Sequence, residues 1–180
     1  MSSFRQLMMK SKTDSNILYA PKLNGTEQIT TLTPTVSIQN NTLRGGSGYL
    51  SLGWDNTVLW ELTFKFRGVS TVAQGGFYII APTMVERDVT EFLYTGDSRI
   101  YMYTNRYSVS SASFLGLGNI TSWENIKFTK INSSSLVLKI GGIQATLSWS
   151  ALSSLSRVCI GVDSWGGTFE MKDIVVTKIS

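Results

Sequence analysis

The sequence has no histidine and a single cysteine among its 180 residues. The absence of histidine excludes Ser-His and Cys-His nucleophile pairs, the commonest general base and the usual zinc sites. The single cysteine, Cys159, excludes an internal disulfide. Its place between Val158 and Ile160 in an apolar stretch predicts a buried, inert thiol. We therefore assign no cofactor.

Charged side chains are also scarce, at 16% of residues, whereas hydrophobic residues make up 42%. This balance is typical of a globular protein, and the length suits one domain with a substantial core. The formal net charge is +4. The basic residues are scattered along the chain, with one tight cluster at Arg5, Lys10 and Lys12. Nucleic-acid binding requires a basic patch or stripe, so we expect no nucleic-acid partner.

Long apolar runs are absent, because no segment reaches the roughly 20 apolar residues that a membrane-spanning helix needs. Residues 1–16 also lack the apolar central region of a secretory signal, since Leu7-Met8-Met9 is too short and charged residues follow it. If Met1 is the natural start, we expect no export by the ordinary route and no membrane span.

The sequence does contain repeated two-residue alternation of apolar and polar side chains, which is typical of strands with one buried face. The clearest single example is Trp60, Leu62, Phe64 and Phe66. A longer series occupies residues 123–178, and its apolar positions are Ile126 and Phe128; Leu136, Leu138 and Ile140; Ile143, Ala145 and Leu147; Val158, Ile160 and Val162; and Phe169 and Met171. Gly, Asn and Ser clusters between these runs supply tight turns. The pattern predicts an all-β sandwich.

The sandwich is expected to occupy residues 35–180, after an arm of residues 1–34 that shows no sustained period. The run 77–81 predicts a central strand covered on both faces and ended by Pro82. Residues 83–118 are less regular, and the strands expected there cover 100–103 and 106–110. Residues 151–155 suit a single helical turn.

The order of these motifs resembles the concanavalin A-like lectin and glucanase superfamily, especially its laminin-G-like modules. The resemblance rests on Trp-x-x-Ile-x-Phe-x-Lys at 123–130, Leu-x-Leu-x-Ile-Gly-Gly at 136–142 and the closing Phe-x-x-x-Asp-Ile-x-Val at 169–176. It implies a two-sheet antiparallel jelly roll, often with glycan or protein recognition on the concave face or rim loops. The superfamily hosts many functions, so the activity does not follow from the fold.

Tyr101 and Tyr103 are the first candidate ligand-binding residues. Ile100 and Met102 suit the core, so strand alternation turns the two tyrosines outward together. Rigid aromatic surfaces with a polar hydroxyl make good recognition sites, and sugar rings stack on such faces. A packing role or a subunit contact is the alternative.

Arg99, Arg106 and Trp165 complete the candidate ligand site. The two arginines lie close in sequence to the tyrosines, and Trp165 precedes Gly166-Gly167 in a turn where rim exposure suits a ligand edge. A plug that closes one end of the sandwich is the alternative for Trp165.

The segment Glu86-Arg-Asp88-Val-Thr-Glu91 resembles the catalytic strand of the retaining β-glucanases in the same superfamily. That resemblance implies Glu86 as nucleophile, Glu91 as acid/base and Asp88 as the residue that tunes them, with carboxyl groups about 5–5.5 Å apart. The chain departs from the family at Arg87, where the family has an apolar residue. Pro82 upstream also favours a loop for Glu86. A solvated acidic face is the competing interpretation, and we expect no enzymatic activity.

No metal site is assigned. Asp55, Asn56, Asp97 and Asp163 carry oxygen ligands of the kind that calcium prefers, but no spacing in the sequence marks such a site.

A recognition-type sandwich without an export signal suggests a virion protein, because virions assemble in the host cytoplasm and leave by lysis. We therefore expect a non-enzymatic structural or receptor-binding component of a phage or archaeal virus, such as a head decoration, tail or fibre-associated protein. Residues 1–34 would anchor it to other virion proteins or sister subunits, most simply in a homo-oligomer. One alternative is a stand-alone, extracellular carbohydrate-binding module that contacts cell-surface glycan. The other is a glycoside hydrolase that uses Glu86 and Glu91.

Overall fold

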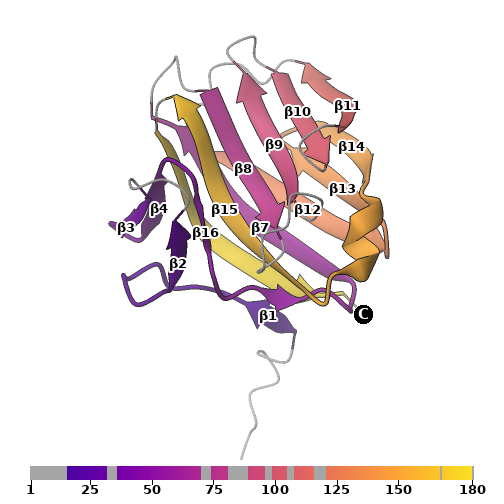
Figure 1. The fold of residues 1–180 in the computed structure, drawn as a ribbon, viewed down its shortest axis with the longest axis horizontal. Coiled ribbons are helices and arrows are strands. Elements are labelled where there is room, and N and C mark those ends of the chain that lie inside the picture. Colours follow the sequence, from indigo (N-terminus) through magenta and orange to yellow (C-terminus); the bar gives the residue numbers. More distant parts are fainter. Residues whose placement is uncertain are drawn as a thin grey trace, which may run out of the picture.

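The protein folds into two antiparallel β-sheets that face one another (Figure 1). The computed structural model describes residues 16–31, 36–69, 74–80, 89–95, 99–104, 108–115, 121–166 and 168–179. For the strands within 89–115 and for residues 74, 75, 78, 163, 165 and 166, the structure describes the backbone but not the side chains. Among the described residues, no helix is long and apolar enough to cross a membrane.

The first sheet, called sheet A, has the strand order β14-β13-β12-β7-β16-β4-β3, and β1 pairs with β16 outside this path. Its strands are β1 Ile17–Tyr19, β3 Ser37–Gln39, β4 Thr42–Gly45, β7 Trp60–Gly68, β12 Glu124–Asn132, β13 Ser135–Ile140, β14 Ile143–Ser148 and β16 Phe169–Lys178. The strand closest to the C-terminus thus lies inside the sheet, between β7 and β4.

The second sheet, called sheet B, has the order β11-β10-β9-β8-β15-β5-β2, and β6 pairs with β15 outside this path. Its strands are β2 Ile29–Thr31, β5 Gly48–Leu50, β6 Trp54–Asp55, β8 Gln74–Ile80, β9 Val89–Thr95, β10 Arg99–Thr104, β11 Ser108–Leu115 and β15 Arg157–Gly166. The two-sheet antiparallel jelly-roll prediction is confirmed.

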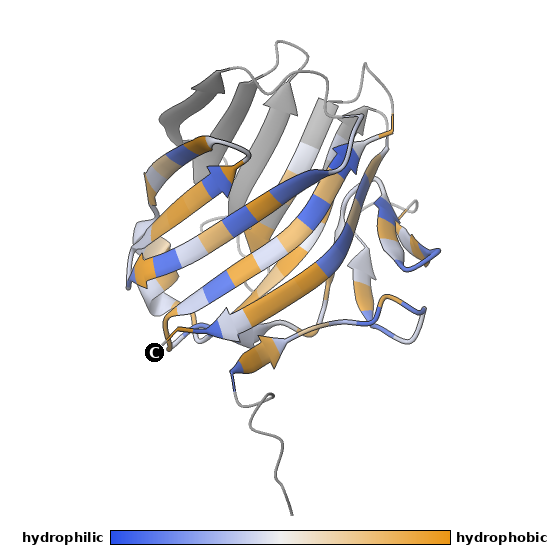
Figure 2. Cartoon of the chain, turned by 180° about the vertical axis from the view of Figure 1, so that it is seen from behind, coloured by the Kyte–Doolittle hydropathy of each residue, from blue (hydrophilic) through white to orange (hydrophobic). Residues whose placement is uncertain are grey.

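The core lies between the sheets and follows the predicted alternation. Trp60, Leu62, Phe64 and Phe66 are all buried in β7, while the residues between them are partly exposed. Phe77 of sheet B meets Phe64 and Phe66 edge-on, with ring centroids 5.1 and 4.9 Å apart. Each such aromatic pair contributes about 0.5–1.5 kcal/mol beyond the burial of its surface. The outward face of sheet A shows the same alternation as a banded pattern of hydropathy (Figure 2).

The strand predicted to be covered on both faces is β8. Phe77 and Ile79 belong to the core between the sheets, whereas Ile80 joins a second buried cluster with Tyr49 and Cys159. Because Ile80 and Ile79 are consecutive strand residues, the second cluster lies on the opposite face of sheet B. The predicted helical turn is also present, as the 3₁₀ helix η2 at Ser150–Ser154.

Two features differ from the sequence prediction. Residues 83–118 contain a further strand, β9 at Val89–Thr95, which lies between β8 and β10. The sequence did not mark it because its apolar residues, Val89 and Phe92 to Tyr94, show no two-residue alternation. Glu170, which lies between the predicted core residues Phe169 and Met171, occupies an outward position of β16, but it is buried, with 6% exposure. Ion pairs with Arg44 and Arg67 account for this burial.

The range expected for an arm, residues 1–34, includes two strands of the sandwich. β1 pairs with β16 in sheet A, and β2 pairs with β5 in sheet B. Between them, Leu23 is buried in the core. Residues 1–15 and 32–35 lie outside the described residues, so the division at residue 34 stays a prediction.

Candidate binding site

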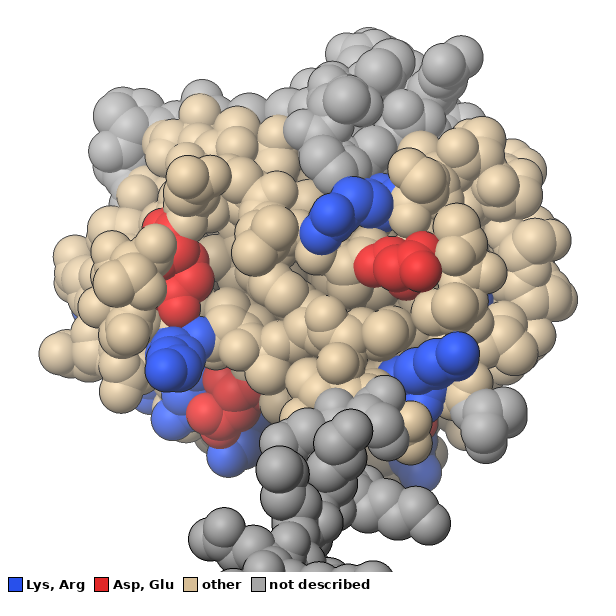
Figure 3. All heavy atoms as spheres, turned by 90° about the horizontal axis from the view of Figure 1, so that it is seen from below, with Lys and Arg blue, Asp and Glu red and all other residues tan. Residues whose placement is uncertain are grey.

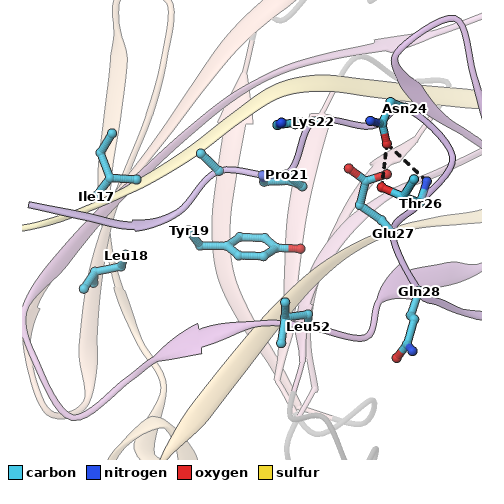
Figure 4. Close-up of a pocket in the computed structure, with 11 residues that line it drawn as sticks. Ile17, Leu18, Tyr19, Pro21, Lys22, Asn24, Thr26, Glu27, Gln28 and Leu52 are labelled. Atoms are coloured by element: carbon cyan, nitrogen blue, oxygen red, sulfur yellow. Dashed lines mark hydrogen bonds between the residues drawn. The ribbon is translucent and has the colours of Figure 1, made fainter. Parts of the chain in front are cut away.

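A pocket of about 910 Å³ lies at one end of the sandwich, between the segment that links β1 to β2 and Leu52 (Figure 4). Residues 17–22, Asn24, residues 26–28 and Leu52 line it, whereas Leu23 turns into the core. Tyr19 lies between Pro21 and Leu52, with its hydroxyl on the side where Glu27 lies. We call this site the N-terminal pocket.

Local hydrogen bonds hold the loop that forms one wall of the N-terminal pocket. The Asn24 side chain accepts hydrogen bonds from the backbone N–H and the hydroxyl of Thr26, at 3.2 and 2.6 Å. The backbone N–H of Leu23 donates to Glu27 Oε1 at 2.6 Å. Leu23 and Gly25 have positive φ values of 53° and 91°, which close the turn. The Asn24-Gly25 turn therefore shapes a preformed wall.

Glu27 carries the negative charge of the N-terminal pocket. Partial burial acts to raise the pKa of its carboxyl, but the backbone N–H groups of Glu27, Leu23, Gly25 and Asn24 outweigh burial and lower it. The carboxylate is therefore ionised at neutral pH. Its second oxygen, Oε2, is shielded from solvent and has no hydrogen-bond partner in the described part of the chain. A ligand hydroxyl can use this acceptor once the atoms that cover it move aside.

Tyr19 forms the aromatic wall of the N-terminal pocket. Its ring stacks on Trp54, with ring centroids 6.1 Å apart and planes inclined by 26°. Burial, followed by the electrostatic influence of Cys159 and Glu27, raises the pKa of the Tyr19 hydroxyl. The hydroxyl thus keeps its proton and remains a hydrogen-bond donor. Trp54 Nε1, behind this ring, is buried and has no partner within the described residues.

The mouth of the N-terminal pocket is apolar. Leu52 and Ile17, two of its lining residues, are 63% and 48% exposed, which is unusual for large aliphatic side chains. Seen from the end where β1 lies, most of the described surface is uncharged, and a small number of acidic and basic side chains are visible (Figure 3). Apolar walls with a few fixed polar groups characterise small-ligand sites. The pocket can therefore hold a ligand with one apolar face and several hydroxyls.

A polar network fills the adjoining corner of the sandwich. Asn56 donates two side-chain hydrogen bonds to the carbonyls of Leu152 and Leu155, at 2.8 and 2.9 Å, and accepts one from Trp60 Nε1 at 2.9 Å. The Lys130 ammonium donates to the Asn56 carbonyl. Burial lowers the pKa of Lys130, and nearby Asp55 partly offsets this effect. These bonds attach η2 to β7 and β12.

The candidate calcium ligands do not come together in a metal site within the described part of the chain. The Asn56 side chain makes the three hydrogen bonds of the polar network. Asp55 accepts hydrogen bonds from the backbone N–H and the hydroxyl of Thr57 at 2.8 and 2.7 Å. Asp97 and the side chain of Asp163 lie outside the description. Within the described residues, no group of three or more His, Cys, Asp or Glu side chains is placed to hold a metal ion.

The predicted tyrosines lie on β10, in sheet B. Tyr101 is the register partner of Leu93, and Tyr103 is the partner of Glu91, which is also opposite Tyr78 on β8. The two tyrosine positions are two residues apart, as the prediction required, but their side chains and that of Glu91 lie outside the description. Their binding role therefore stays a prediction.

The other predicted site residues are placed only in part. Arg99 begins β10, and Trp165 lies on β15, which β8 and β9 separate from β10. Arg106, Glu86 and Asp88 lie outside the described residues. Cys159 is buried as predicted, and burial raises the pKa of its thiol to about 11. A thiol in that state is protonated and unreactive at neutral pH.

The sequence analysis did not find the N-terminal pocket. Asn24-Gly25 indicated a turn, and Tyr19 and Pro21 stood nearby, but the segment had no sustained period. The opposing wall, Leu52, is distant in sequence and follows β5. A pattern restricted to neighbouring residues carries no signal for this contact.

Sequence comparison finds no matching family model and no matching characterised protein. Comparison of folds does find similar structures. One, from work on endo-acting O-glycanases that human gut bacteria express to initiate mucin breakdown, has a TM-score of 0.65 and 12% identity, over 91% of this chain and 100% of the other. A lectin from Bauhinia forficata in complex with GalNAc has a TM-score of 0.61 and 15% identity, over 92% and 99%.

A third similar structure is the CBM2 module of the evolved Dit protein of Lactobacillus casei BL23 phage J-1. Its TM-score is 0.57 and its identity 12%, over 92% of this chain and 97% of that module. Identities this low establish the fold alone. The chain has the concanavalin A-like β-sandwich fold, in agreement with the resemblance found in the sequence.

Proposed function

We propose that this chain is a non-enzymatic glycan-binding domain that serves a virus particle as a receptor-binding component. The observation that carries the proposal is the N-terminal pocket, where Tyr19, Pro21 and Leu52 supply apolar surface next to the unpartnered Glu27 Oε2. A sugar ring offers an apolar C–H face and hydroxyl donors, so its chemistry matches both parts. Aromatic and apolar surface holds the ring, and the carboxylate fixes its orientation.

The fold comparisons support this proposal in two ways. The similar structures include a lectin in complex with GalNAc and a phage Dit module, and each is covered almost completely by this chain. The chain therefore has the dimensions of one binding module. We retain the β10 positions Tyr101 and Tyr103 as a second candidate glycan contact, and Arg99, Arg106 and Trp165 as further candidate ligand-binding residues.

A glycan array probed with the full chain tests the binding. We expect at least one neutral glycan to bind, and Leu52→Ser or Glu27→Gln to weaken binding about tenfold, or roughly 1.4 kcal/mol. Leu59→Ser is the matched control, because Leu59 is also exposed, at 41%, and does not line the pocket. An equal loss in the control, or no bound glycan, would contradict the proposal.

The same array separates the two candidate surfaces. If Tyr101→Ala or Tyr103→Ala abolishes binding while Leu52→Ser and Glu27→Gln do not, the glycan lies on β10 and not in the N-terminal pocket. Genes for capsid, portal or tail proteins next to the coding sequence would favour the virion role, and a surrounding operon for glycan degradation would count against it.

A glycoside hydrolase is the second candidate function. It is favoured by the likeness to a structure from work on O-glycanases and by Glu91, which lies on an interior strand of sheet B opposite Tyr103. Its test is the release of reducing ends from any glycan that the array identifies. We expect no release. Hydrolysis that disappears in both Glu86→Gln and Glu91→Gln would replace the binding proposal with this one.

A further inference from the structure

A row of charged residues crosses the outward face of sheet A. Arg44, Glu170 and Arg67 are register partners on the neighbouring strands β4, β16 and β7. Glu170 Oε2 accepts from Arg67 Nε and Nη2 at 2.7 and 2.6 Å, and Arg44 Nη1 lies 3.4 Å from Oε1. One carboxylate thus holds two guanidinium groups, and the row keeps one positive charge in excess.

Trp123 continues this row and positions two cations. The Arg67 guanidinium lies 4.6 Å from the centroid of the Trp123 ring, and the Lys172 ammonium lies 4.3 Å from it. Each cation–π contact contributes about 0.5–1 kcal/mol at an exposed site. Together with Glu170, the indole fixes side chains that would otherwise lose rotamer freedom on binding a ligand. These cations are therefore ordered before any ligand arrives.

A shallow hollow of about 360 Å³ lies next to this row. Thr63, Lys65, Asn125 and Lys127 line it, together with Asp173 at its edge. Lys65 pairs with Asp173 at 3.0 Å, and Lys127 pairs with Glu61 at 2.6 Å. Both lysines are more than two-fifths exposed. Exposed ion pairs of this kind contribute little, about 0–1 kcal/mol, so an incoming anion can compete for the lysines.

Positive charge is concentrated on this face. Two pairs of lysines are direct register partners, Lys65 with Lys172 and Lys127 with Lys139. Like charges directly opposite each other on a sheet are destabilising, so these positions do not serve the stability of the fold. Six cations of sheet A share this outward face, and we call them the basic strip: Arg44, Lys65, Arg67, Lys127, Lys139 and Lys172. Glu61, Glu170 and Asp173 oppose them, which leaves three of the chain's four net positive charges here.

We infer that the basic strip binds an anionic polysaccharide. Ile131, 44% exposed, also faces outward on β12, but it lies at the far end of that strand from Trp123, so the strip lacks the apolar centre of a protein interface. The Trp123 ring is occupied by two cations, so it does not offer the open aromatic platform that single-stranded nucleic acid uses. A polymer with spaced carboxylate or sulfate groups matches a flat array of fixed and mobile cations. This inference concerns the opposite sheet from β10 and does not depend on the N-terminal pocket.

Three polymers with the same backbone test the inference: dextran, carboxymethyl-dextran and dextran sulfate. We expect the full chain to bind a charged dextran, with affinity that falls as salt rises, and not to bind neutral dextran. The charged dextran that binds more tightly identifies the group as carboxylate or sulfate. No binding to either charged polymer at low salt would overturn the inference.

Matched lysine variants locate the surface. Lys65→Gln combined with Lys172→Gln should weaken binding about tenfold and flatten the salt dependence. Lys12→Gln combined with Lys178→Gln removes the same charge from two lysines that belong neither to the strip nor to the N-terminal pocket, and should change affinity less than about twofold. Equal losses in the two double variants would mean that net charge alone attracts the polymer, which overturns a site on this face.

Trp123→Leu tests the positioning role without a change of charge. We expect a loss of about threefold, with an unchanged salt slope, because the cations remain but are no longer held by the ring. A single-stranded DNA oligomer of matched charge is the competitor. Tighter binding of the oligomer through the same lysines would assign the strip to nucleic acid and overturn the inference.

Discussion

Two neighbouring regions at one end of the sandwich differ in whether their buried polar atoms have hydrogen-bond partners. Around Asn56, the side-chain amide, the Trp60 indole and the Lys130 ammonium are all hydrogen-bonded. At the N-terminal pocket, Glu27 Oε2 and, behind the Tyr19 ring, Trp54 Nε1 are buried and have no hydrogen-bond partner among the described residues. The regions meet where Trp54 contacts Trp60 edge-on, at 5.3 Å between ring centroids.

This difference separates a structural network from a recognition site. Native proteins satisfy most buried polar groups, and each exception requires an explanation. At Asn56 the bonds attach η2 to the sheets, so the network stabilises the fold. At Glu27 the unused acceptor borders an open pocket, so a ligand that displaces the atoms covering it can supply the missing bond. Trp149 Nε1, just before η2, likewise has no hydrogen-bond partner in the described part of the chain, and it belongs neither to the pocket nor to the network.

The largest effect is expected where the pocket wall meets sheet B. Gly53 lies between Leu52 and Trp54, and an added Cβ would be 1.9 Å from the carbonyl oxygen of Val158. The obstacle is backbone, which cannot move aside cheaply, so Gly53→Ala should lower the free energy of unfolding by about 3 kcal/mol or more. Urea denaturation measures this change.

Gly142→Ala is the matched control for Gly53→Ala. A Cβ at Gly142 meets nothing within 4 Å. We expect a change within about 0.5 kcal/mol. Similar losses in the two variants would show that the close approach of residue 53 to β15 is not what holds this wall.

Asn56→Ala should have the next largest effect. It leaves Trp60 Nε1 and the Leu155 carbonyl without their Asn56 partner, and the Leu152 carbonyl with only the 3.4 Å bond from the Leu155 N–H, which we expect to lower the free energy of unfolding by about 2–3 kcal/mol. Asn125→Ala, at an exposed position of β12, should change it by less than about 0.5 kcal/mol. If both variants unfold at the same urea concentration, the contrast between the two regions fails.

Glu27→Gln should have the smallest effect on stability, with a characteristic pH dependence. The folded state lowers the pKa of Glu27 below 4.5, so its ionised form stabilises the fold above that pH. This contribution is lost as pH falls through the lowered pKa. The free energy of unfolding of the wild type should therefore exceed that of the variant by a larger margin at about pH 7 than at about pH 3. A constant difference in urea midpoints would contradict this assignment.

Most of the fold could be predicted because alternation is a local property. The positions from Ile126 to Val162 that the sequence assigned to the core are buried or partly buried, and β7 follows the prediction residue by residue. β9 was missed because Val89–Thr95 mixes polar and apolar residues without a clear period. Glu170 was predicted to face outward, but only the three-strand register reveals the two arginines that bury it.

The candidate sites were harder to predict because they depend on pairing between distant strands. Leu52 and Tyr19 share a pocket through contacts that no local pattern records. The basic residues looked scattered along the chain, yet the register of β4, β16, β7, β12 and β13 places six of them on one face. The predictions for Tyr101 and Tyr103 concern their side chains and await the array experiment.

The position of β16 has a consequence for biosynthesis. The ribosome makes β16 after every strand with which it pairs, yet β16 lies between β7 and β4 and also holds β1. Until it emerges, a nascent chain presents unpaired edges on β7 and β4, the kind of surface that chaperones cover. Sheet A can therefore close only after translation of Phe169–Lys178, and a ribosome stalled before that point would carry an incomplete, aggregation-prone domain.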